Sequence, residues 1–460
     1  MDFDLIVLGL GPGGEELAEK LAAAGKRVLG IDPHLVGGEC PYYGCIPSKM
    51  IVRGAEVLAE SRRVNQLAGH ASDEPDLGPV ARRIRDEATD DWNDAVAVKR
   101  LEDSGATFVR GAGRLVGRDA EGRLIVQVGD TTHTGAAVCV ATGTAPAVPP
   151  IDGLADLPRG VDDLVWTNRE IVKAREAPRS MVIIGGGSVG CEFAQSFGRF
   201  GTSITIIEGA PHVLMPEEPE AGKVVADVFQ REGITVRQGT GVQSVARGGD
   251  GVVVTLADGT TATGEKLLVA AGRRPNLSDI GLDTVGLDPS ARTLDVDEHM
   301  QVGDGIFAVG DITGRGAFTH VAVWQARVLI AHLLGQDEPY GGYHGLAWVT
   351  FTDPEVGRVG LTEQQARDRG LTVRVGRQQI SGNSRGWIHG PGNDGFVKIV
   401  EDAERGVLVG ATVVAPAGGE LLGLLTLAVH AEVPVRTLRT MHYAFPTLHR
   451  AVAEAVADLS

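Results

Sequence analysis

Two cysteines stand close together in the stretch GGECPYYGCIPSK, residues 37–49. Cys40 and Cys45, with four residues between them, could form a redox disulfide, supply half of a metal site, or be two inert core residues. A zinc site normally takes four ligands in closely spaced pairs, whereas Cys139 and Cys191 are isolated in the chain. We therefore predict no metal site and favour a redox pair over inert packing.

The surroundings of the pair support the redox interpretation. Gly37 and Gly38 precede it and indicate that a helix begins here. A helix N-terminus lowers the pKa of a thiol and makes the reactive thiolate available. The chain has 4 cysteines in 460 residues, far too few for a secreted disulfide scaffold, which predicts a reducing, cytoplasmic location.

The elements that must position this pair begin at the N-terminus. An apolar run at residues 5–8 breaks at a glycine-rich turn, an amphipathic stretch follows, and a second apolar run ends at Asp32. This order is typical of a dinucleotide-binding unit, in which the glycines allow a tight turn, close approach of a pyrophosphate and close helix packing. Asp32 would accept hydrogen bonds from a ribose. The three glycines are Gly9, Gly11 and Gly14.

The same organisation recurs about 175 residues later in the chain. The apolar run 181–184 leads into a glycine turn, a helical stretch and a run that ends at Glu208. A carboxylate there suits a ribose 2′-hydroxyl and repels a 2′-phosphate, and residues 209–212 offer no arginine, so NADH is favoured while NADPH stays possible. The glycines of this turn are Gly185, Gly187 and Gly190.

Two such units predict two Rossmann-like dinucleotide-binding domains in an α/β fold. We place the first at residues 1–148 with a return segment at 273–345, and the second at 149–272. Alternating strands followed by helices predict a closing α+β domain at 346–460.

Composition excludes several classes of partner. The formal net charge is −17, and no block of basic residues is long enough to follow a phosphate backbone. Nucleic acid and anionic membranes are therefore not expected partners. We find neither a signal peptide nor an apolar run of the roughly 18 residues that a membrane span needs.

Taken together, these motifs resemble the two-cysteine flavoprotein disulfide reductases, the family of dihydrolipoamide dehydrogenase, glutathione reductase, mycothione reductase and mercuric reductase. The resemblance extends over nearly the whole chain. It includes the two glycine turns, the C-x4-C-x-P-S-K pattern at 40–49, Ala-Thr-Gly ending at Gly143, the AGRRPN stretch that contains Gly272, Val-Gly-Asp ending at Asp311, and DPEVGRVG at 353–360.

The resemblance implies roles for particular residues. The first nucleotide would be FAD, with Asp32 on its adenosine ribose and Asp311 on its ribityl chain. Cys45 would be the charge-transfer thiol beside the flavin, and Cys40 the outer thiol that exchanges with substrate. The positions carried over from the family are Lys49 and Glu192 as the pair near the flavin N5, and Gly38, Gly143 and Gly272 as further cofactor contacts. For Lys49 and Glu192 the alternative is an ordinary surface lysine and a glutamate on a helix face. The C-terminal domain would complete a homodimer.

The sequence departs from the family near its C-terminus. Thiol exchange needs an acid–base group, which the family supplies with a His-Pro-Thr-x-x-Glu motif. Here Phe445 stands in place of the histidine and Arg450 in place of the glutamate. His442 and His449 flank this motif and could replace the missing base, but we favour polar surface residues. In a helix predicted to begin near residue 447, His449 would point away from the position of Phe445. Tyr42 and Tyr43 lie between the cysteines. We interpret them as packing residues, and the alternative is that a phenol donates a proton or holds a flat substrate.

These features predict an FAD-containing, NAD(P)H-dependent oxidoreductase acting on a sulfur group, in which hydride from NADH reaches the Cys40–Cys45 disulfide and then a small-molecule disulfide, dithiol or other acceptor. The alternative is a reductase of quinones, metal ions or other electron acceptors that needs no histidine base. A non-catalytic redox-sensing flavoprotein is disfavoured because both nucleotide motifs and the redox motif are intact. Mercury reduction is disfavoured because no C-terminal cysteine pair is present.

Overall fold

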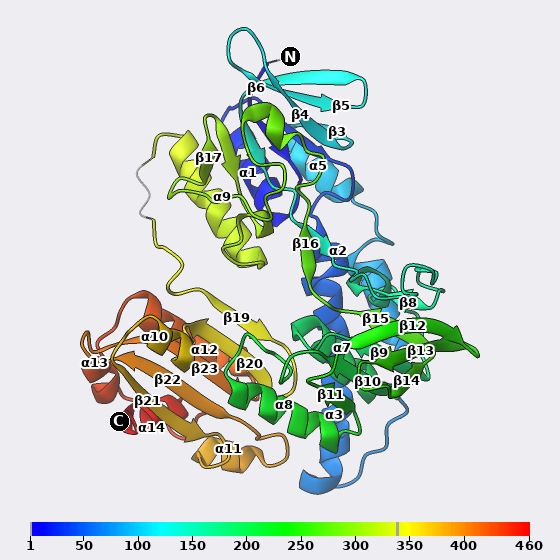
Figure 1. Ribbon diagram of the computed structural model, residues 1–460. Coiled ribbons are helices and arrows are strands. Elements are labelled where there is room, and N and C mark those ends of the chain that lie inside the picture. The colour runs from blue at the N-terminus through cyan, green and yellow to red at the C-terminus, as the bar shows by residue number, and fades with distance from the viewer. Residues whose placement is uncertain (1, 337–339) are drawn as a thin grey trace. The chain divides into compact units, whose positions relative to one another are not determined.

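The computed structural model describes residues 2–336 and 340–460, which form two compact units (Figure 1). The first unit comprises residues 1–47, 82–147 and 273–342, and the second comprises 48–81, 148–272 and 343–460.

A mixed sheet forms the centre of the first unit. Parallel strands run in the order β18, β6, β1, β2, β3, as expected where helical crossovers join the strands. Antiparallel strands extend the sheet at β17 and at the β4–β5 hairpin beside β6. The strands are β1 (Asp2–Leu8), β2 (Val28–Asp32), β3 (Thr107–Arg110), β4 (Gly113–Arg118), β5 (Leu124–Val128), β6 (Thr131–Val140), β17 (Gln301–Gly303) and β18 (Ile306–Ala308).

Helices of the first unit follow from clear sequence signals. Helix α1 (Pro12–Ala23) begins with proline, whose fixed φ suits the first helical turn, and it buries Leu17 and Leu21 one turn apart. It packs beside α9 (Thr319–Leu333). The remaining elements of this unit are α2 (Glu39–Tyr43), the π-helical turn Ile84–Ala88, α5 (Ala95–Asp103), the 3₁₀ turns Leu282–Val285 and Asp311–Thr313, and the antiparallel strands β7 (Thr144–Pro146) and β16 (Arg273–Pro275).

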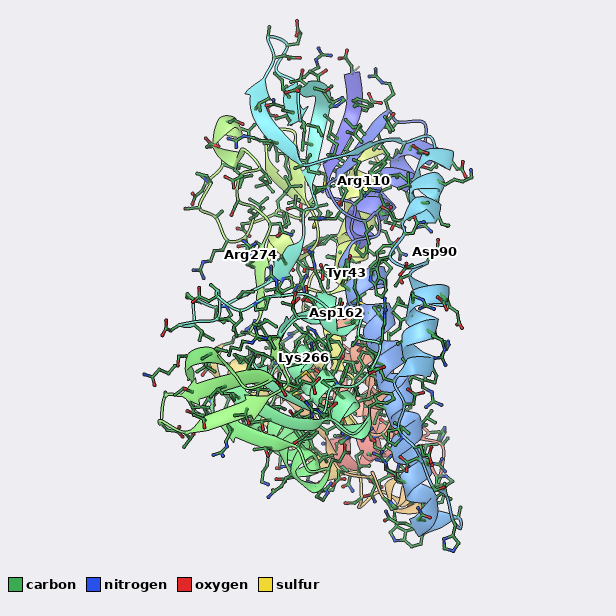
Figure 2. All side chains as sticks on the ribbon, turned by 90° about the vertical axis from the view of Figure 1, so that its right-hand side faces the viewer. Tyr43, Asp90, Arg110, Asp162, Lys266 and Arg274 are labelled. Carbon is green, nitrogen blue, oxygen red and sulfur yellow. The ribbon has the colours of Figure 1, made fainter. Side chains whose placement is uncertain are left out.

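The second unit contains a fully parallel sheet in the order β11, β10, β9, β15, β8. Lys266 at its β15 strand donates a hydrogen bond of 3.1 Å to the carbonyl of Asp162 (Figure 2). Its elements are β8 (Val165–Trp166), α6 (Asn168–Ile171), β9 (Ser180–Ile184), α7 (Ser188–Arg199), β10 (Ser203–Glu208), α8 (Pro219–Arg231), β11 (Thr235–Gln238) and β15 (Lys266–Val269), with the antiparallel sheet of β12 (Val242–Gly248), β13 (Gly251–Leu256) and β14 (Thr261–Gly264).

An antiparallel sheet in the order β19, β20, β23, β22, β21 forms the C-terminal part of the same unit. Helix α12 packs on this sheet through its Leu421–Leu425 side, while Leu427 is exposed. The elements are β19 (Ala347–Thr350), β20 (Glu355–Gly360), α10 (Glu363–Asp368), β21 (Val373–Gln379), α11 (Ser384–His389), β22 (Phe396–Asp402), β23 (Val407–Ala415), α12 (Gly418–His430), α13 (Val435–Thr440) and α14 (Arg450–Ala457).

The long helix α3 (Cys45–Leu67) begins in the first unit and continues into the second, followed by α4 (Gly78–Arg83). The sequence assigns residues 48–81 to the first nucleotide-binding domain, but they pack in the second unit. Gly54 lies against Val80 and Phe200, and Arg62 donates to the Arg199 carbonyl at 2.8 Å. A helix of 23 residues is about 35 Å long at 1.5 Å per residue.

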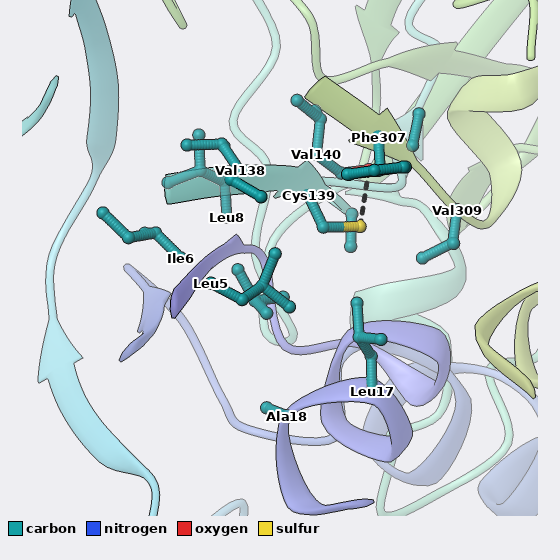
Figure 3. Close-up of a cluster of buried hydrophobic side chains, with 14 of the residues drawn as sticks. Leu5, Ile6, Leu8, Leu17, Ala18, Val138, Cys139, Val140, Phe307 and Val309 are labelled. Carbon is teal, nitrogen blue, oxygen red and sulfur yellow. Dashed lines mark hydrogen bonds between the residues drawn. The ribbon is translucent and has the colours of Figure 1, made fainter. Parts of the chain in front are cut away.

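The core of the first unit is a continuous apolar cluster between its sheet and its helices. Cys139 on β6 lies in this cluster among Leu5, Leu8, Leu17 and Phe307 (Figure 3). Burial raises the pKa of the Cys139 thiol, so it remains protonated and unreactive.

Candidate functional site

The first glycine turn joins β1 to α1 and leaves a backbone surface open to a ligand. Gly9 has φ of +95° and faces the carbonyl of Ala141, where a side chain would clash. Gly14 likewise faces the carbonyl of Gly9, so helix and strand approach as closely as glycine permits. Nothing lies within 4 Å of the position a Gly11 side chain would take, at the start of α1. An open helix N-terminus of this kind fits a pyrophosphate.

Asp32 ends β2 beside this turn. It is 7% exposed, and its carboxylate accepts backbone hydrogen bonds from Leu10 and His34, both at 2.7 Å. Burial raises its pKa, while the two donors act in the opposite direction. These hydrogen bonds hold the carboxylate against the glycine turn.

The other predicted FAD contacts lie in the same unit and connect to the turn. A side chain at Gly38, where φ is +68°, would lie 2.7 Å from the Cα of Gly11. Gly143 has φ of +61° and open space around it. Asp311 accepts a hydrogen bond of 2.6 Å from Thr144, which also accepts one of 2.6 Å from Arg273. The open glycine positions and the two carboxylates fit a dinucleotide.

The cysteine pair lies at a junction between two helices. Cys40 is in α2, and Cys45 is the first residue of α3. Gly44 separates the two helices. The predicted helix start is therefore present, and it presents positive helix-dipole charge to the Cys45 sulfur. Both residues are thiols, with Cys40 half-buried and Cys45 exposed. We call residues 37–45 the redox loop.

Hydrogen bonds connect the two sulfurs to each other and to α9. The Cys40 thiol is hydrogen-bonded to Cys45, and this bond together with burial raises the pKa of Cys40. The Cys45 sulfur lies 3.5 Å from the Thr319 hydroxyl. Cys40 is therefore harder to deprotonate in this geometry than an ordinary thiol.

The tyrosines between the cysteines have different surroundings. Tyr42 is 7% exposed, and its ring lies against Gly37, where a side chain would approach it to 3.3 Å. Burial raises the pKa of its phenol. The ring centroid of Tyr43 lies 6.5 Å away, and Tyr43 is only half-buried. Tyr42 is thus a packing residue of the redox loop.

The second glycine turn, between β9 and α7, repeats the geometry of the first. Gly185 has φ of +107° and Gly190 packs on its carbonyl, while the Gly187 position is open at the start of α7. Glu208 at the end of β10 accepts backbone hydrogen bonds from Gly186 at 2.6 Å and Ala210 at 2.7 Å. Gly272, also predicted to contact a cofactor, has φ of +107° and open space around it.

Lys49 and Glu192 are brought together in the second unit. Their side chains form an ion pair of 2.7 Å, with Glu192 only 4% exposed. The other Glu192 oxygen accepts the backbone N–H of Phe351 at 2.9 Å, and the Lys49 ammonium lies 4.7 Å from the centre of the Phe351 ring. The two residues therefore form a connected pair, in which Glu192 is buried and the Lys49 side chain is 36% exposed. Their place near a flavin stays a prediction.

The C-terminal turn, residues 442–450, presents an aromatic surface. Phe445 is 67% exposed, and the Arg450 guanidinium lies 5.5 Å from the centre of its ring. Helix α14 begins at Arg450, three residues later than the predicted start near residue 447, and His449 is its N-cap residue. The ring of His449 lies 6.0 Å from that of Tyr443, and His442 is exposed.

Metal-ligand geometry is absent from the part of the chain that the structure describes, where no group of three or more histidine, cysteine or acidic residues could hold an ion. Cys191, one of the isolated cysteines, is fully buried, and burial raises its pKa. Across residues 2–336 and 340–460, no helix is long and apolar enough to span a membrane.

Two family models match the chain. The model of the pyridine nucleotide-disulphide oxidoreductase family matches residues 3–326. The model of the dimerisation domain of this family matches residues 346–456. The chain belongs to the pyridine nucleotide-disulphide oxidoreductase family.

Relatives agree over the full length of the chain. It is 31% identical to dihydrolipoyl dehydrogenase from Thermus scotoductus, covering 99% of this chain and 97% of that protein. It is 32% identical to dihydrolipoyl dehydrogenase from Mycobacterium tuberculosis, covering 99% and 98%. The crystal structure of LpdA from M. tuberculosis superimposes with a TM-score of 0.85 at 29% identity, covering 98% of each chain. The HOCl-induced flavoprotein disulfide reductase RclA from Escherichia coli gives 0.83 at 25% identity, covering 99% of each.

Membership confirms several sequence predictions. The fold is α/β with two Rossmann-like nucleotide-binding regions and a dimerisation domain. The protein is an oxidoreductase of the class that acts on sulfur groups, and its cofactors are FAD and NAD(H).

Some site residues of this pyridine nucleotide-disulphide oxidoreductase were not predicted from the sequence. Thr319 contacts Cys45 from 274 positions along the chain, and Phe351 contacts both members of the Lys49–Glu192 pair. Neither residue type carries a chemical signal by itself. Gln195 and Arg199 follow Glu192 at helical spacing and bind Asp353 at 2.7 and 2.8 Å, a pattern on α7 that could have been detected.

Proposed function

We propose that this protein is an NADH-dependent disulfide or dithiol oxidoreductase in which Cys40 and Cys45 cycle between disulfide and dithiol. The observation that carries the proposal is the geometry of the redox loop. The two cysteines lie at a helix junction, where Cys45 is the first residue of α3 and its sulfur lies 3.5 Å from the Thr319 hydroxyl. A thiol at a helix N-terminus is favoured in its reactive thiolate form.

In this proposal both nucleotide sites are assigned by their carboxylates and glycines. FAD would be held by Asp32, Asp311 and the cradle of glycines in the first unit, and NADH by Glu208 and the second glycine turn. The residues of the cradle are Gly9, Gly11, Gly14, Gly38 and Gly143, and those of the second site are Gly185, Gly187, Gly190 and Gly272. When bound, FAD supplies two-electron transfer from NADH to a disulfide. NADH is preferred because the Glu208 carboxylate repels a 2′-phosphate.

The protein's own groups handle the sulfur chemistry. Reduction breaks the Cys40–Cys45 bond, and the two electrons and two protons give two thiols. Cys40 then attacks an acceptor disulfide, and Cys45 displaces it to re-form the bond, releasing the acceptor as two thiols. Lys49 contacts Glu192 and Phe351, and we assign it to the position near the flavin N5 that the family resemblance implies. Thr319 orients the Cys45 sulfur.

Acceptor choice is limited by the C-terminal turn. Phe445 has no proton to exchange, so thiols with a high pKa leave slowly. We therefore propose an acceptor whose thiols leave without an acid, rather than lipoamide. A second candidate is direct reduction of quinones, metal ions or similar acceptors, which the exposed aromatic ring of Phe445 and the absent base favour.

A homodimer forms part of the proposal, because residues 346–456 match the dimerisation domain and Leu427 of α12 is exposed. A cytoplasmic location stays a prediction from the cysteine content.

The proposal is tested by trapping thiols. One equivalent of NADH is added anaerobically to the FAD-loaded protein, and alkylated cysteines are located by mass spectrometry. We expect two new thiols at Cys40 and Cys45, and a fall on the order of a thousandfold or more in NADH-dependent disulfide reduction in Cys45→Ser. Cys139→Ala is the matched control and should retain activity. Undiminished disulfide reduction by Cys45→Ser would refute the proposal, and retained quinone reduction alone would favour the second candidate.

A further inference from the structure

A short left-handed turn lies beside the redox loop in the first unit. Asp90, Asp91 and Trp92 have φ values of +47°, +52° and +59° in succession. Residues with a side chain rarely adopt this conformation, and a run of three is disfavoured at every step. Such strain persists only where surrounding contacts stabilise it, and it concentrates at functional positions. Within the turn, the backbone N–H of Trp92 donates to the Thr89 hydroxyl at 3.4 Å and that of Asn93 to the Asp90 carbonyl at 3.1 Å. The Trp92 side chain makes a further contact outside the turn.

That contact is with the segment between the two cysteines. The Trp92 indole N–H donates a hydrogen bond of 3.0 Å to the carbonyl of Tyr42. Helix α2 has five residues, and the carbonyls of its last turn have no partner further along the helix. The left-handed turn directs Trp92 to one of these carbonyls, between Cys40 and Cys45.

Asp94, two residues later, binds the residue immediately before the redox loop. It is 8% exposed, and its Oδ2 accepts the backbone N–H of Val36 at 2.7 Å. The same oxygen accepts a hydrogen bond of 2.6 Å from Arg110 at the end of β3. Asp90, Arg110 and Tyr43 can be located in Figure 2. Val36 precedes the redox loop and Tyr42 lies inside it, so the segment 90–94 fixes the loop on both sides of Cys40.

We propose that Trp92 and Asp94 are positioning residues that set the redox potential of the Cys40–Cys45 pair. This inference rests on the proposed function, in which the pair cycles. Forming the disulfide joins the two sulfurs and releases two electrons and two protons, and its equilibrium depends on how closely the thiols are held before they react. Loosening the loop lowers their effective concentration. The disulfide then becomes easier to reduce, and the potential rises.

The test is Trp92→Phe, which keeps an aromatic ring and removes the N–H donor. The FAD-loaded protein is equilibrated with mixtures of reduced and oxidised glutathione, and the two cysteines are trapped and counted by mass spectrometry. We expect the dithiol–disulfide equilibrium to shift about five- to tenfold toward the dithiol, which corresponds to about 20–30 mV. Trp387→Phe, an exposed tryptophan in α11 of the second unit, is the matched control and should leave the equilibrium unchanged.

A second variant covers the case in which Trp92→Phe fails to fold. Arg110→Gln weakens the hold on Asp94 at an exposed position and should shift the equilibrium about two- to threefold in the same direction. An equilibrium that stays unchanged in a folded variant of either kind overturns this inference. Failure of the proposed function is recognised separately. In that case Cys45→Ser would retain disulfide reduction, and NADH would generate no new thiols at Cys40 and Cys45 of the parent protein.

Discussion

The redox loop and the C-terminal turn differ in how their side chains are held. Within the first unit, the redox loop is fixed by side chains from distant parts of the chain, namely Trp92, Asp94 and Thr319. In the C-terminal turn, Phe445 is 67% exposed, and its ring contacts the guanidinium of Arg450 five residues later. The first region contains both cysteines of the proposed redox pair, and the second has Phe445 and Arg450 where the resemblance expects a histidine and a glutamate.

This difference indicates which part of the site tolerates amino-acid substitution. Altering a residue of the redox loop disturbs several contacts in the core of a unit, whereas the C-terminal turn can exchange two side chains at little cost to packing. Acceptor specificity is therefore expected to vary at the C-terminal turn while the cysteine pair stays constant.

Restoring the acid–base pair would remove the difference between the two regions. In Phe445→His/Arg450→Glu we expect turnover of lipoamide to rise on the order of ten- to a hundredfold, because a positioned acid–base group contributes about 10²–10⁴ when ideally placed. Steady-state assays with NADH and lipoamide measure this. An aromatic disulfide, whose thiols leave without protonation, is the control substrate and should respond little. Equal gains on both substrates would contradict an acid–base role for the position.

The reactivity of Cys40 tests the redox loop, which is the other region in the comparison. Its pKa is raised by the hydrogen bond to Cys45 and by burial, so little thiolate is present at neutral pH. In the reduced protein, alkylation of Cys40 should be slower at pH 8 than that of an unstructured cysteine peptide. Its rate should rise about tenfold per pH unit, continuing past the ordinary thiol pKa of about 8.5, because the thiolate is the nucleophile.

Cys45→Ala provides the matched variant for this measurement. It removes the sulfur to which Cys40 is hydrogen-bonded, so the thiolate of Cys40 should form at lower pH and alkylation at pH 8 should accelerate. Rapid alkylation of Cys40 already at pH 7 in the reduced parent protein would contradict the assigned geometry.

The sequence predicted local features well. Both glycine turns, their carboxylates Asp32 and Glu208, and the helix that starts at the cysteines are specified by short stretches of neighbouring residues. Contacts between distant segments could not be predicted. Trp92 donates to Tyr42 across 50 positions, and its left-handed backbone arises without glycine. Residues 48–67 of α3 belong to the second unit, where Gly54 lies against Phe200, a contact that no local pattern reveals.

The smallest expected effect concerns Lys49. It follows the redox loop along α3 and belongs to the second unit, where Glu192 and Phe351 contact it. Phe351→Leu removes the ring beneath the Lys49 ammonium and keeps the backbone N–H that binds Glu192. A cation–π contact contributes about 0.5–2 kcal/mol, so we expect the rate at which NADH generates thiols to fall about three- to tenfold. Rapid-quench alkylation measures this rate, and Phe351→Tyr, which retains the ring, should restore it. If both variants lose rate equally, the ring acts through packing alone, and Lys49 is positioned by Glu192 without it.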